Sequence, residues 1–250
     1  MRTIPLCRPL QLLLLFFVCN NALADAVRFS DQTQAAGINY VNICGGKNKQ
    51  YVLEAHGSGA AFFDSDNDGD LDLYITNGAT FSTLKNQSGP GNVFYEQIET
   101  GHFQDISTST NTAHAGWGTG IAVGDVDNNG LRDLYVSNYG ANVLYYNRGE
   151  NVFVDGTSQA RVGGDQFSAS AAFFDYDNDG DLDLYATNYV VFDAENRPLS
   201  PKLCTFYGGL QVYCGPKGLI GAPDVLYQNN GDGTFMDVTE ASGISSANRY

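Results

Sequence analysis

One string of 17 residues constrains the fold of this chain more than any other feature, because it occurs twice with little change. AFFDSDNDGDLDLYITN fills residues 61–77, and AFFDYDNDGDLDLYATN, which differs at two positions, fills residues 172–188. AVGDVDNNGLRDLYVSN at residues 122–138 keeps the same frame with more substitutions. Such self-similarity is typical of proteins whose successive units stack on their neighbours. We therefore interpret the chain as a series of structural repeats.

Two further phrases recur around these strings. An F-x-D phrase occurs at Phe29–Asp31, Phe103–Asp105, Phe153–Asp155 and Phe235–Asp237. A strand-like phrase occurs at Asn92–Tyr95, Asn142–Tyr145 and Asp224–Tyr227. Short aromatic and β-branched runs between Gly, Asn and Asp turns predict an all-β fold. The Asp-rich loops begin 61 and 50 residues apart, which suits a four-stranded propeller blade, and we expect each repeat to begin with its F-x-D strand.

The aspartates of each string alternate around a glycine, and carboxylates this close repel one another unless a cation lies among them. Oxygen ligands on alternate residues around a sharp glycine turn are typical of calcium sites. Numbering each loop from its first Asp, we predict Ca²⁺ ligands at positions 1, 3, 5 and 9, with a backbone carbonyl at position 7. The candidate ligands are Asp64, Asp66, Asp68, Asp70 and Asp72; Asp125, Asp127, Asn129, Leu131 and Asp133; and Asp175, Asp177, Asp179, Asp181 and Asp183.

Two other interpretations of these loops are less favourable. An EF-hand needs a bidentate Glu at position 12, where this chain has Ile75, Val136 and Ala186. Metal-free Asx turns would explain a single loop, but three loops in register favour calcium. The second loop should bind most weakly, because it has three aspartates and Arg132 where the others have five aspartates, and fewer carboxylates give lower affinity.

The charge balance is strongly acidic, with 13 Lys and Arg residues against 28 Asp and Glu residues. Nucleic-acid binding depends on basic contacts to phosphates, so this composition argues against nucleic acid as a partner. It argues equally against docking on anionic membranes. Thirteen of the acidic residues lie inside the three loops, so much of the acidity has a local role.

The N-terminus is typical of a cleavable signal peptide. A basic start with Arg2, an apolar run at Leu10–Val18 and a small-residue motif at Ala22–Ala24 follow one another. The apolar run is too short for a membrane span, and no later segment approaches the length required. We expect residues 1–24 to be removed and residues 25–250 to form a repeat region that is secreted or periplasmic.

A long excursion interrupts the repeat frame at about residues 190–223. Outside the cytoplasm, Cys204 and Cys214 are close enough in sequence to close a short disulfide loop. Cys44 is then left over, either as a free thiol or as the partner of a cysteine in another chain. We expect the insertion to be a disulfide-pinned surface loop, and a binding role is the alternative.

These features closely resemble the FG-GAP/VCBS repeats of the integrin α-chain type. More specifically, Cys214-Gly-Pro and the run Asn229–Thr239 resemble the cartilage acidic protein family, in which such repeats precede an ASPIC/UnbV domain. The resemblance implies an all-β fold, a β-propeller of four-stranded blades with calcium in its loops. It implies about three to four blades here, as part of a seven-bladed ring. Since three blades cannot close a ring and would leave a sheet surface uncovered, we expect a fragment of a longer protein rather than an assembly of several chains.

No catalytic constellation stands out in the sequence. His56, His102 and His114 are scattered, and we predict that the chain is not an enzyme. Its many Tyr and Phe residues fall mostly on the repeat strands, which favours core packing over a sugar-binding surface. The sequence favours an extracytoplasmic calcium-binding scaffold for adhesion or protein interaction, with an unidentified protein or glycan ligand. The alternative is a carbohydrate-binding module, or the partial propeller of a polysaccharide-degrading enzyme.

Overall fold

The computed structural model describes residues 27–47, 49–197, 204–216 and 218–244. The chain divides into two units, residues 1–32 and residues 33–250. In the first unit, the described residues 27–32 contain neither helix nor strand. The signal peptide predicted for residues 1–24 lies outside the described residues. Every sheet described below belongs to the second unit.

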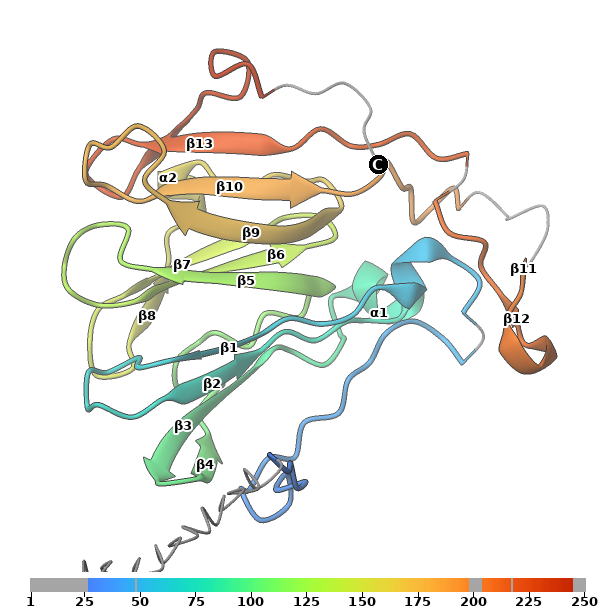
Figure 1. Cartoon of the computed structure of the whole chain (residues 1–250), viewed down its shortest axis with the longest axis horizontal. Coiled ribbons are helices and arrows are strands. Elements are labelled where there is room, and N and C mark those ends of the chain that lie inside the picture. Colours follow the sequence, from blue (N-terminus) through green and yellow to red (C-terminus); the bar gives the residue numbers. More distant parts are fainter. Residues whose placement is uncertain (1–26, 48, 198–203, 217, 245–250) are drawn as a thin grey trace, which may run out of the picture. The chain divides into compact units, whose positions relative to one another are not determined.

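Three four-stranded antiparallel sheets form the framework of the second unit (Figure 1). The first consists of β1 (Ala60–Phe63), β2 (Asp72–Ile75), β3 (Val93–Glu99) and β4 (His102–Asp105). The second consists of β5 (Gly118–Gly124), β6 (Asp133–Asn138), β7 (Val143–Asn147) and β8 (Phe153–Asp155). The third consists of β9 (Ser168–Phe174), β10 (Asp183–Asn188), β13 (Val225–Asn229) and β14 (Phe235–Asp237). Each strand pairs with the next one in its sheet, so the prediction of an all-β fold with propeller-type blades is confirmed.

The F-x-D phrases close the sheets rather than open them. Phe103, Phe153 and Phe235 lie on β4, β8 and β14, each of which pairs with the strand just before it. A short hairpin joins each such pair, and short connections produce antiparallel neighbours. The predicted repeat boundary is therefore wrong by one strand. Phe29 lies outside any strand.

The insertion at about residues 190–223 carries a small sheet of its own. Its elements are β11 (Cys204–Thr205), η2 (Tyr207–Gly209) and β12 (Gln211–Val212). Cys204 and Cys214 form a disulfide bond with their Cα atoms 5.0 Å apart, and Cys44 is a free thiol. The remaining helices are η1 (Val52–Ala55), α1 (Phe81–Asn86) and α2 (Thr157–Ala160). None of the helices in the described ranges is long and apolar enough to cross a membrane.

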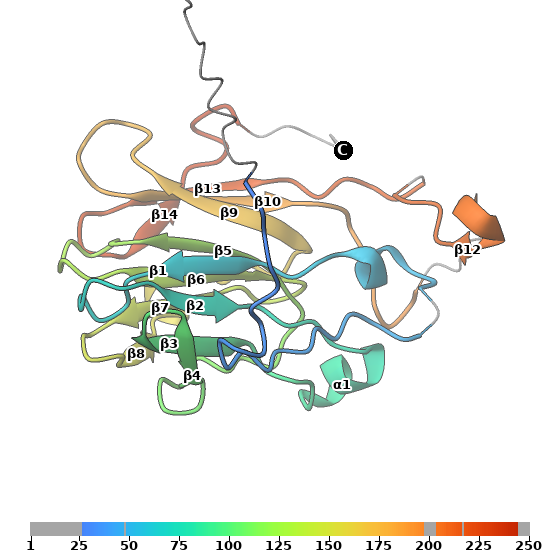
Figure 2. The same cartoon turned by 60° about the horizontal axis from the view of Figure 1, so that its bottom comes forward.

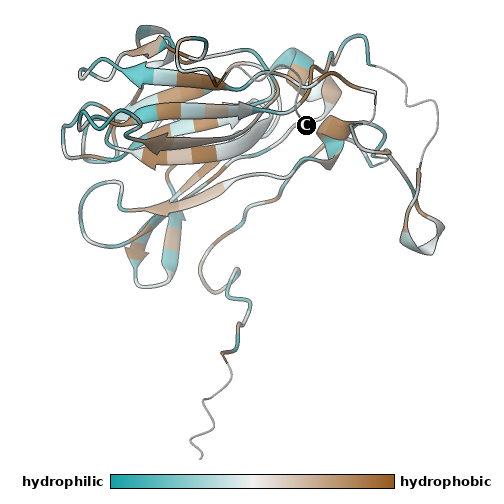
Figure 3. Cartoon of the chain, turned by 45° about the horizontal axis from the view of Figure 1, so that its top comes forward, coloured by the Kyte–Doolittle hydropathy of each residue, from teal (hydrophilic) through white to brown (hydrophobic). Residues whose placement is uncertain are grey.

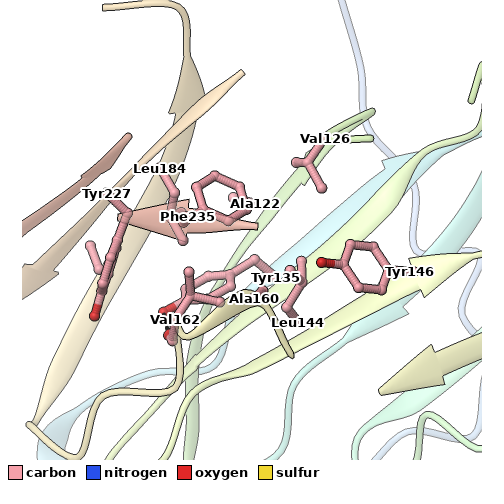
Figure 4. Close-up of a cluster of buried hydrophobic side chains, with 11 residues drawn as sticks. Ala122, Val126, Tyr135, Leu144, Tyr146, Ala160, Val162, Leu184, Tyr227 and Phe235 are labelled. Carbon is pink, nitrogen blue, oxygen red and sulfur yellow. Dashed lines mark hydrogen bonds between the residues drawn. The ribbon is translucent and has the colours of Figure 1, made fainter. Parts of the chain in front are cut away.

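Apolar side chains fill the spaces between neighbouring sheets. Because side chains alternate between the two faces of a strand, Phe63, Tyr74 and Phe94 share the face that packs against the second sheet. The other face of the second sheet packs against the third, with Tyr135 and Leu184 fully buried between them (Figure 4). Figure 3 shows the resulting hydrophobic bands along the strands. The stacked sheets thus share continuous cores.

A third cluster closes the end of the sheets that lies away from the Asp-rich loops. Trp117 and Phe167 are buried directly before β5 and β9, whereas the Asp-rich loops follow those two strands. Leu53 of η1 is fully buried in the same cluster. With the far ends of the strands fixed in this way, the Asp-rich loops extend from a rigid support.

The first strands of the three sheets, β1, β5 and β9, approach one another closely (Figure 2). A Cβ atom added to Gly59 would lie 3.0 Å from the Cα of Gly120. One added to Gly120 would lie 3.0 Å from the Cα of Ser170 and 3.2 Å from the carbonyl oxygen of Ala169. These glycines therefore permit backbone contact between neighbouring blades.

We expect Gly120→Ala to lower the melting temperature by about 3–10 °C, because overpacking costs about 1–3 kcal/mol. The added methyl group meets the backbone of β9, which cannot move away without separating the two sheets. Gly57→Ala is the matched control, since a Cβ there has no neighbour within 4 Å. Equal melting temperatures for the two variants in a thermal scan would contradict this account of the close approach.

Candidate metal centres

The three Asp-rich loops connect the first two strands of each sheet and lie at the same end of the stack (Figure 1). Asp64, Asp125 and Asp175 each come directly after the last residue of β1, β5 or β9. The ninth residue of each loop is the first residue of the next strand. Each loop is therefore anchored by a strand on both sides.

Two residues in each loop adopt the left-handed backbone conformation. In the first loop these are Asn67, with φ of 64°, and Gly69, with φ of 96°. The same pairs occur at Asn128 and Gly130, and at Asn178 and Gly180. Asn is the residue that best tolerates this conformation after Gly. The loop glycines were predicted from the sequence, whereas the asparagines at position 4 were not, although the repeated Asn was the available signal.

The first aspartate closes the turn. Each accepts a hydrogen bond from the backbone N–H of its loop glycine: Asp64 from Gly69 (3.1 Å), Asp125 from Gly130 (2.8 Å) and Asp175 from Gly180 (3.1 Å). These bonds bring the start of the loop back over its middle. The local backbone thus shapes a compact acidic turn.

The ninth residue clamps the loop to the third strand of its sheet. Asp133 is completely buried, and its two oxygens accept hydrogen bonds from the backbone N–H groups of Val126 and Asn147, both at 2.8 Å. The same two-sided clamp recurs in the other loops: Asp183 accepts from Tyr176 and Asn229, and Asp72 accepts from Ser65 and Gln97. Their residue type and spacing predicted a role as ligands but not this structural role.

The loops bring three carboxylates together in each sheet, with ligand oxygens within 4.8 Å of one another. The groups are Asp64, Asp66 and Asp68; Asp125, Asp127 and Asp133; and Asp175, Asp177 and Asp183. Positions 1 and 3 belong to every group. The third member is position 5 in the first loop and position 9 in the other two.

The remaining candidate ligands at positions 5 and 7 make local contacts. Asn129 accepts a hydrogen bond from the N–H of Leu131 at 2.8 Å, and Asp179 accepts one from Asp181 at 2.9 Å. The carboxylate of Asp181 also accepts from the Asn128 side chain at 2.6 Å. These oxygens contribute to turns and to contacts between loops.

The donor set fits a calcium ion. The Oδ1 atoms of Asp64, Asp70 and Asp127 are buried and have no hydrogen-bond partner among the described residues. Buried polar atoms without partners are costly, and a bound cation would satisfy those of Asp64 and Asp127, which belong to two of the groups of three carboxylates. All the candidate ligand atoms are oxygens, as hard cations such as Ca²⁺ prefer.

Burial makes the ionised form of some of these carboxyls unfavourable. It raises the pKa of Asp133 to about 7, against the opposing effect of the hydrogen bonds from Val126 and Asn147, and the charges of Asp127 and Asp125 raise it further. Burial also raises the pKa of Asp66 and of Asp183. A cation in each loop would counter the mutual repulsion and favour the ionised forms.

The third position of each loop has a side-chain donor beside it. Arg148 Nη1 lies 2.6 Å from Asp127 Oδ2, and Gln228 Nε2 lies 2.6 Å from Asp177 Oδ2. In the first loop, Asn151 Nδ2 lies 3.4 Å from Asp66 Oδ2. The second loop therefore differs from the others in having a charged donor.

Two asparagine side chains bridge successive loops, and we call them the amide bridges. Asn147 donates to the carbonyl oxygens of Ser65 (2.6 Å) and Arg132 (3.1 Å). Asn229 donates to those of Val126 (2.8 Å) and Leu182 (3.0 Å). In each case one acceptor lies in the loop of the same sheet and the other in the loop of the preceding sheet. The loops are thus linked from sheet to sheet.

A cavity of about 830 Å³ lies beside α1 and the start of the insertion, and its lining includes Phe81, Tyr139 and Arg197. The guanidinium carbon of Arg197 lies 4.4 Å from the centroid of the Phe81 ring and 5.4 Å from that of Tyr51. A face of the Phe81 ring is therefore occupied by a cation, whereas sugar binding to an aromatic ring needs an open face.

Residues 64–136 and 125–186 both match the family described as FG-GAP-like repeat. The two matched segments overlap and together span residues 64–186, just under half of the chain. No curated protein is significantly similar to it in sequence. Among solved structures, it is similar to an Agrocybe aegerita lectin described by its specific recognition of non-reducing terminal N-acetylglucosamine, with 14% identity and a TM-score of 0.35. That match covers 72% of this chain and 36% of the lectin chain, so this chain spans little more than a third of it.

The FG-GAP-like matches begin at Asp64 and Asp125, the first residues of two Asp-rich loops. Each match ends within the strand that follows the next loop, at Val136 of β6 or Ala186 of β10. The matched repeats therefore contain all three loops of the candidate metal centres.

Proposed function

We propose that this chain is an extracytoplasmic calcium-binding repeat protein that acts as a scaffold for adhesion or protein interaction, and that it is not an enzyme. The FG-GAP-like repeats support a scaffold role. The observation that carries the calcium proposal is the buried, unpartnered Oδ1 atom of Asp64 and of Asp127, each within a group of three carboxylates. The function of the loops would then be to hold the blade surfaces in shape.

The residues that would hold the ion are the three carboxylates of each group. Bound calcium supplies positive charge that offsets the repulsion between them. The protein's own contribution is positioning: the loop glycines donate to Asp64, Asp125 and Asp175, and the clamp residues fix the loop to the third strand. The ligand oxygens are thus arranged largely by the backbone.

We also propose kinship with the cartilage acidic protein family and export by the predicted signal peptide. Cys214-Gly-Pro and the run Asn229–Thr239 support the first proposal. The basic, apolar and small-residue regions of residues 1–24 support the second. Expression of the full chain with mass spectrometry of the mature N-terminus tests export, with cleavage before Asp25 as the expected result.

Carbohydrate binding is the competing function. The cavity beside α1 gives it little support, because Arg197 lies over the ring of Phe81. A glycan array in the presence of calcium separates the two functions. We expect no binding to any sugar class, and saturable binding to one class would favour the carbohydrate-binding function.

Calcium titration by calorimetry is expected to show at least two classes of site. The first and third loops each have five aspartates, whereas the second has three and includes Arg132. Calcium affinity rises with the number of carboxylates, so the second loop should fill last. Three equal sites would contradict this ranking, and no heat of binding would contradict the calcium proposal itself.

A further inference from the structure

One ion pair among the described residues involves an Asp-rich loop, and it joins Arg148 to Asp127. The Nη1 atom of Arg148 lies 2.6 Å from Asp127 Oδ2, and the Arg148 guanidinium carbon lies 4.8 Å from the centroid of the Tyr146 ring. The Asp127 side chain is only 14% exposed, whereas the Arg148 side chain is 43% exposed. The guanidinium group of Arg148 therefore contacts the mostly buried carboxylate of Asp127, which belongs to the second group of carboxylates.

The corresponding contacts in the other loops are neutral. Gln228 Nε2 donates to Asp177 Oδ2 at 2.6 Å, the same distance as in the Arg148 contact. Asn151 Nδ2 lies 3.4 Å from Asp66 Oδ2. An amide is thus sufficient to orient the third-position carboxylate, and the charge of Arg148 needs a separate explanation.

We propose that Arg148 is a resident counter-ion of the second loop, which keeps this loop ordered without calcium and weakens calcium binding there. This inference rests on the proposed calcium function and concerns its regulation. A guanidinium remains charged at every physiological pH, and charge-assisted hydrogen bonds to carboxylates are short and strong. Calcium entering the second group must therefore approach a like charge or displace it.

The ion pair reduces the calcium affinity of the second loop without blocking the site. Arg148 contacts Oδ2 of Asp127, while Oδ1 is buried and has no partner among the described residues. Asp125 and Asp133 also keep oxygens within reach of the same point. The three loops would then fill in two stages, the first and third loops before the second.

Backbone amides provide a separate reporter for each loop. The N–H groups of Gly69, Gly130 and Gly180 each donate to the first aspartate of their own loop. Their ¹H–¹⁵N resonances, followed during calcium titration of the full chain, give three midpoints. We expect Gly130 to shift last in the wild type. In Arg148→Gln the calcium concentration at the Gly130 midpoint should fall about tenfold, because an unfavourable charge beside the ion is removed. The calcium concentrations at the Gly69 and Gly180 midpoints should change little.

Two variants control for net charge and for folding. Arg132→Gln also removes one positive charge, here from the second loop itself, but Arg132 is exposed and forms no ion pair among the described residues, so we expect a change of about twofold. Arg148→Lys keeps the charge and should keep the late midpoint of Gly130. Equal effects of Arg148→Gln and Arg132→Gln would overturn the proposal, because net charge alone would then account for the weak site.

Hydrogen exchange in EDTA tests the ordering role of Arg148. We expect Gly130 to exchange more slowly than Gly69 and Gly180 in the wild type, and at a similar rate to them in Arg148→Gln. If all three amides shift with calcium but Arg148→Gln leaves the Gly130 midpoint unchanged, the counter-ion proposal fails and the calcium function stands. If no amide shifts with calcium, both are overturned.

Discussion

Excess EDTA is expected to lower the melting temperature of this protein by about 10–20 °C relative to a calcium-saturated sample. A ligand present at a hundred times its dissociation constant stabilises the folded state by about 2.7 kcal/mol per site. Two filled acidic loops would thus contribute about 5 kcal/mol, and 1 kcal/mol corresponds to about 2–4 °C in a domain of this size. The physical cause is the return of repulsion between the carboxylates of each group when the ion leaves.

Differential scanning calorimetry measures this shift directly. Re-addition of calcium in excess over the chelator should restore the melting temperature, which separates metal removal from any other effect of EDTA. In a double variant that combines Asp66→Asn with Asp177→Asn, EDTA should shift the melting temperature much less. Each substitution neutralises one member of a carboxylate group, Asp66 in the first and Asp177 in the third. A wild-type melting temperature that does not respond to chelator would contradict structural calcium in these loops.

Replacement of the clamp residue in Asp133→Ala is expected to reduce the free energy of unfolding by about 3–5 kcal/mol even in EDTA. The substitution leaves the backbone N–H groups of Val126 and Asn147 without their acceptors in a buried position. A buried donor without a partner costs about 1–3 kcal/mol. Urea denaturation in the presence of EDTA measures this loss free of any contribution from calcium.

Asp127→Asn is the matched comparison, because Asp127 belongs to the same group of carboxylates but accepts no backbone N–H bond in the described structure. In EDTA it should cost less than about 1 kcal/mol, the usual worth of a partly exposed ion pair. In calcium it should reduce the calcium-dependent part of the stability. If the two variants behave alike in EDTA, Asp133 has no structural role beyond that of a ligand.

The sequence predicted the all-β fold and the position of the Asp-rich loops because both depend on local patterns. The alternation of residues in Phe62–Phe63 and Leu73–Tyr74 defines strand faces, and the structure places Phe63 and Tyr74 in the core while Phe62 remains exposed. The loop glycines have the left-handed conformation that a sharp turn requires. The candidate ligands at positions 1 and 3 are brought together in all three loops.

The sequence could not predict which strand begins each four-stranded sheet. A repeating pattern can be divided at any strand without changing its period, and only pairing between strands decides where a sheet ends. The F-x-D strand at Phe103 pairs with β3, before it in sequence, through contacts such as Gln97 to Phe103. No spacing in the sequence distinguishes this from pairing with the strand that follows.

The contacts that distinguish the loops from one another were also inaccessible from the sequence. Arg148 lies 21 residues from Asp127 in the chain, outside the Asp-rich string, so the sequence does not assign its charge to the second loop. Arg132 lies within that loop, but it is exposed and makes no ion pair among the described residues. Which of the two arginines contacts Asp127 depends on the directions of their side chains. For Arg148 this direction depends on the register of β7.

The amide bridges have a consequence for how the protein unfolds. Asn147 joins the loop of the second sheet to Ser65 in the first, and Asn229 joins the loop of the third sheet to Val126 in the second. Nearest-neighbour coupling of this kind makes the stability of each sheet depend on that of the sheet beside it. Loss of calcium from one loop would then loosen the adjacent blade as well.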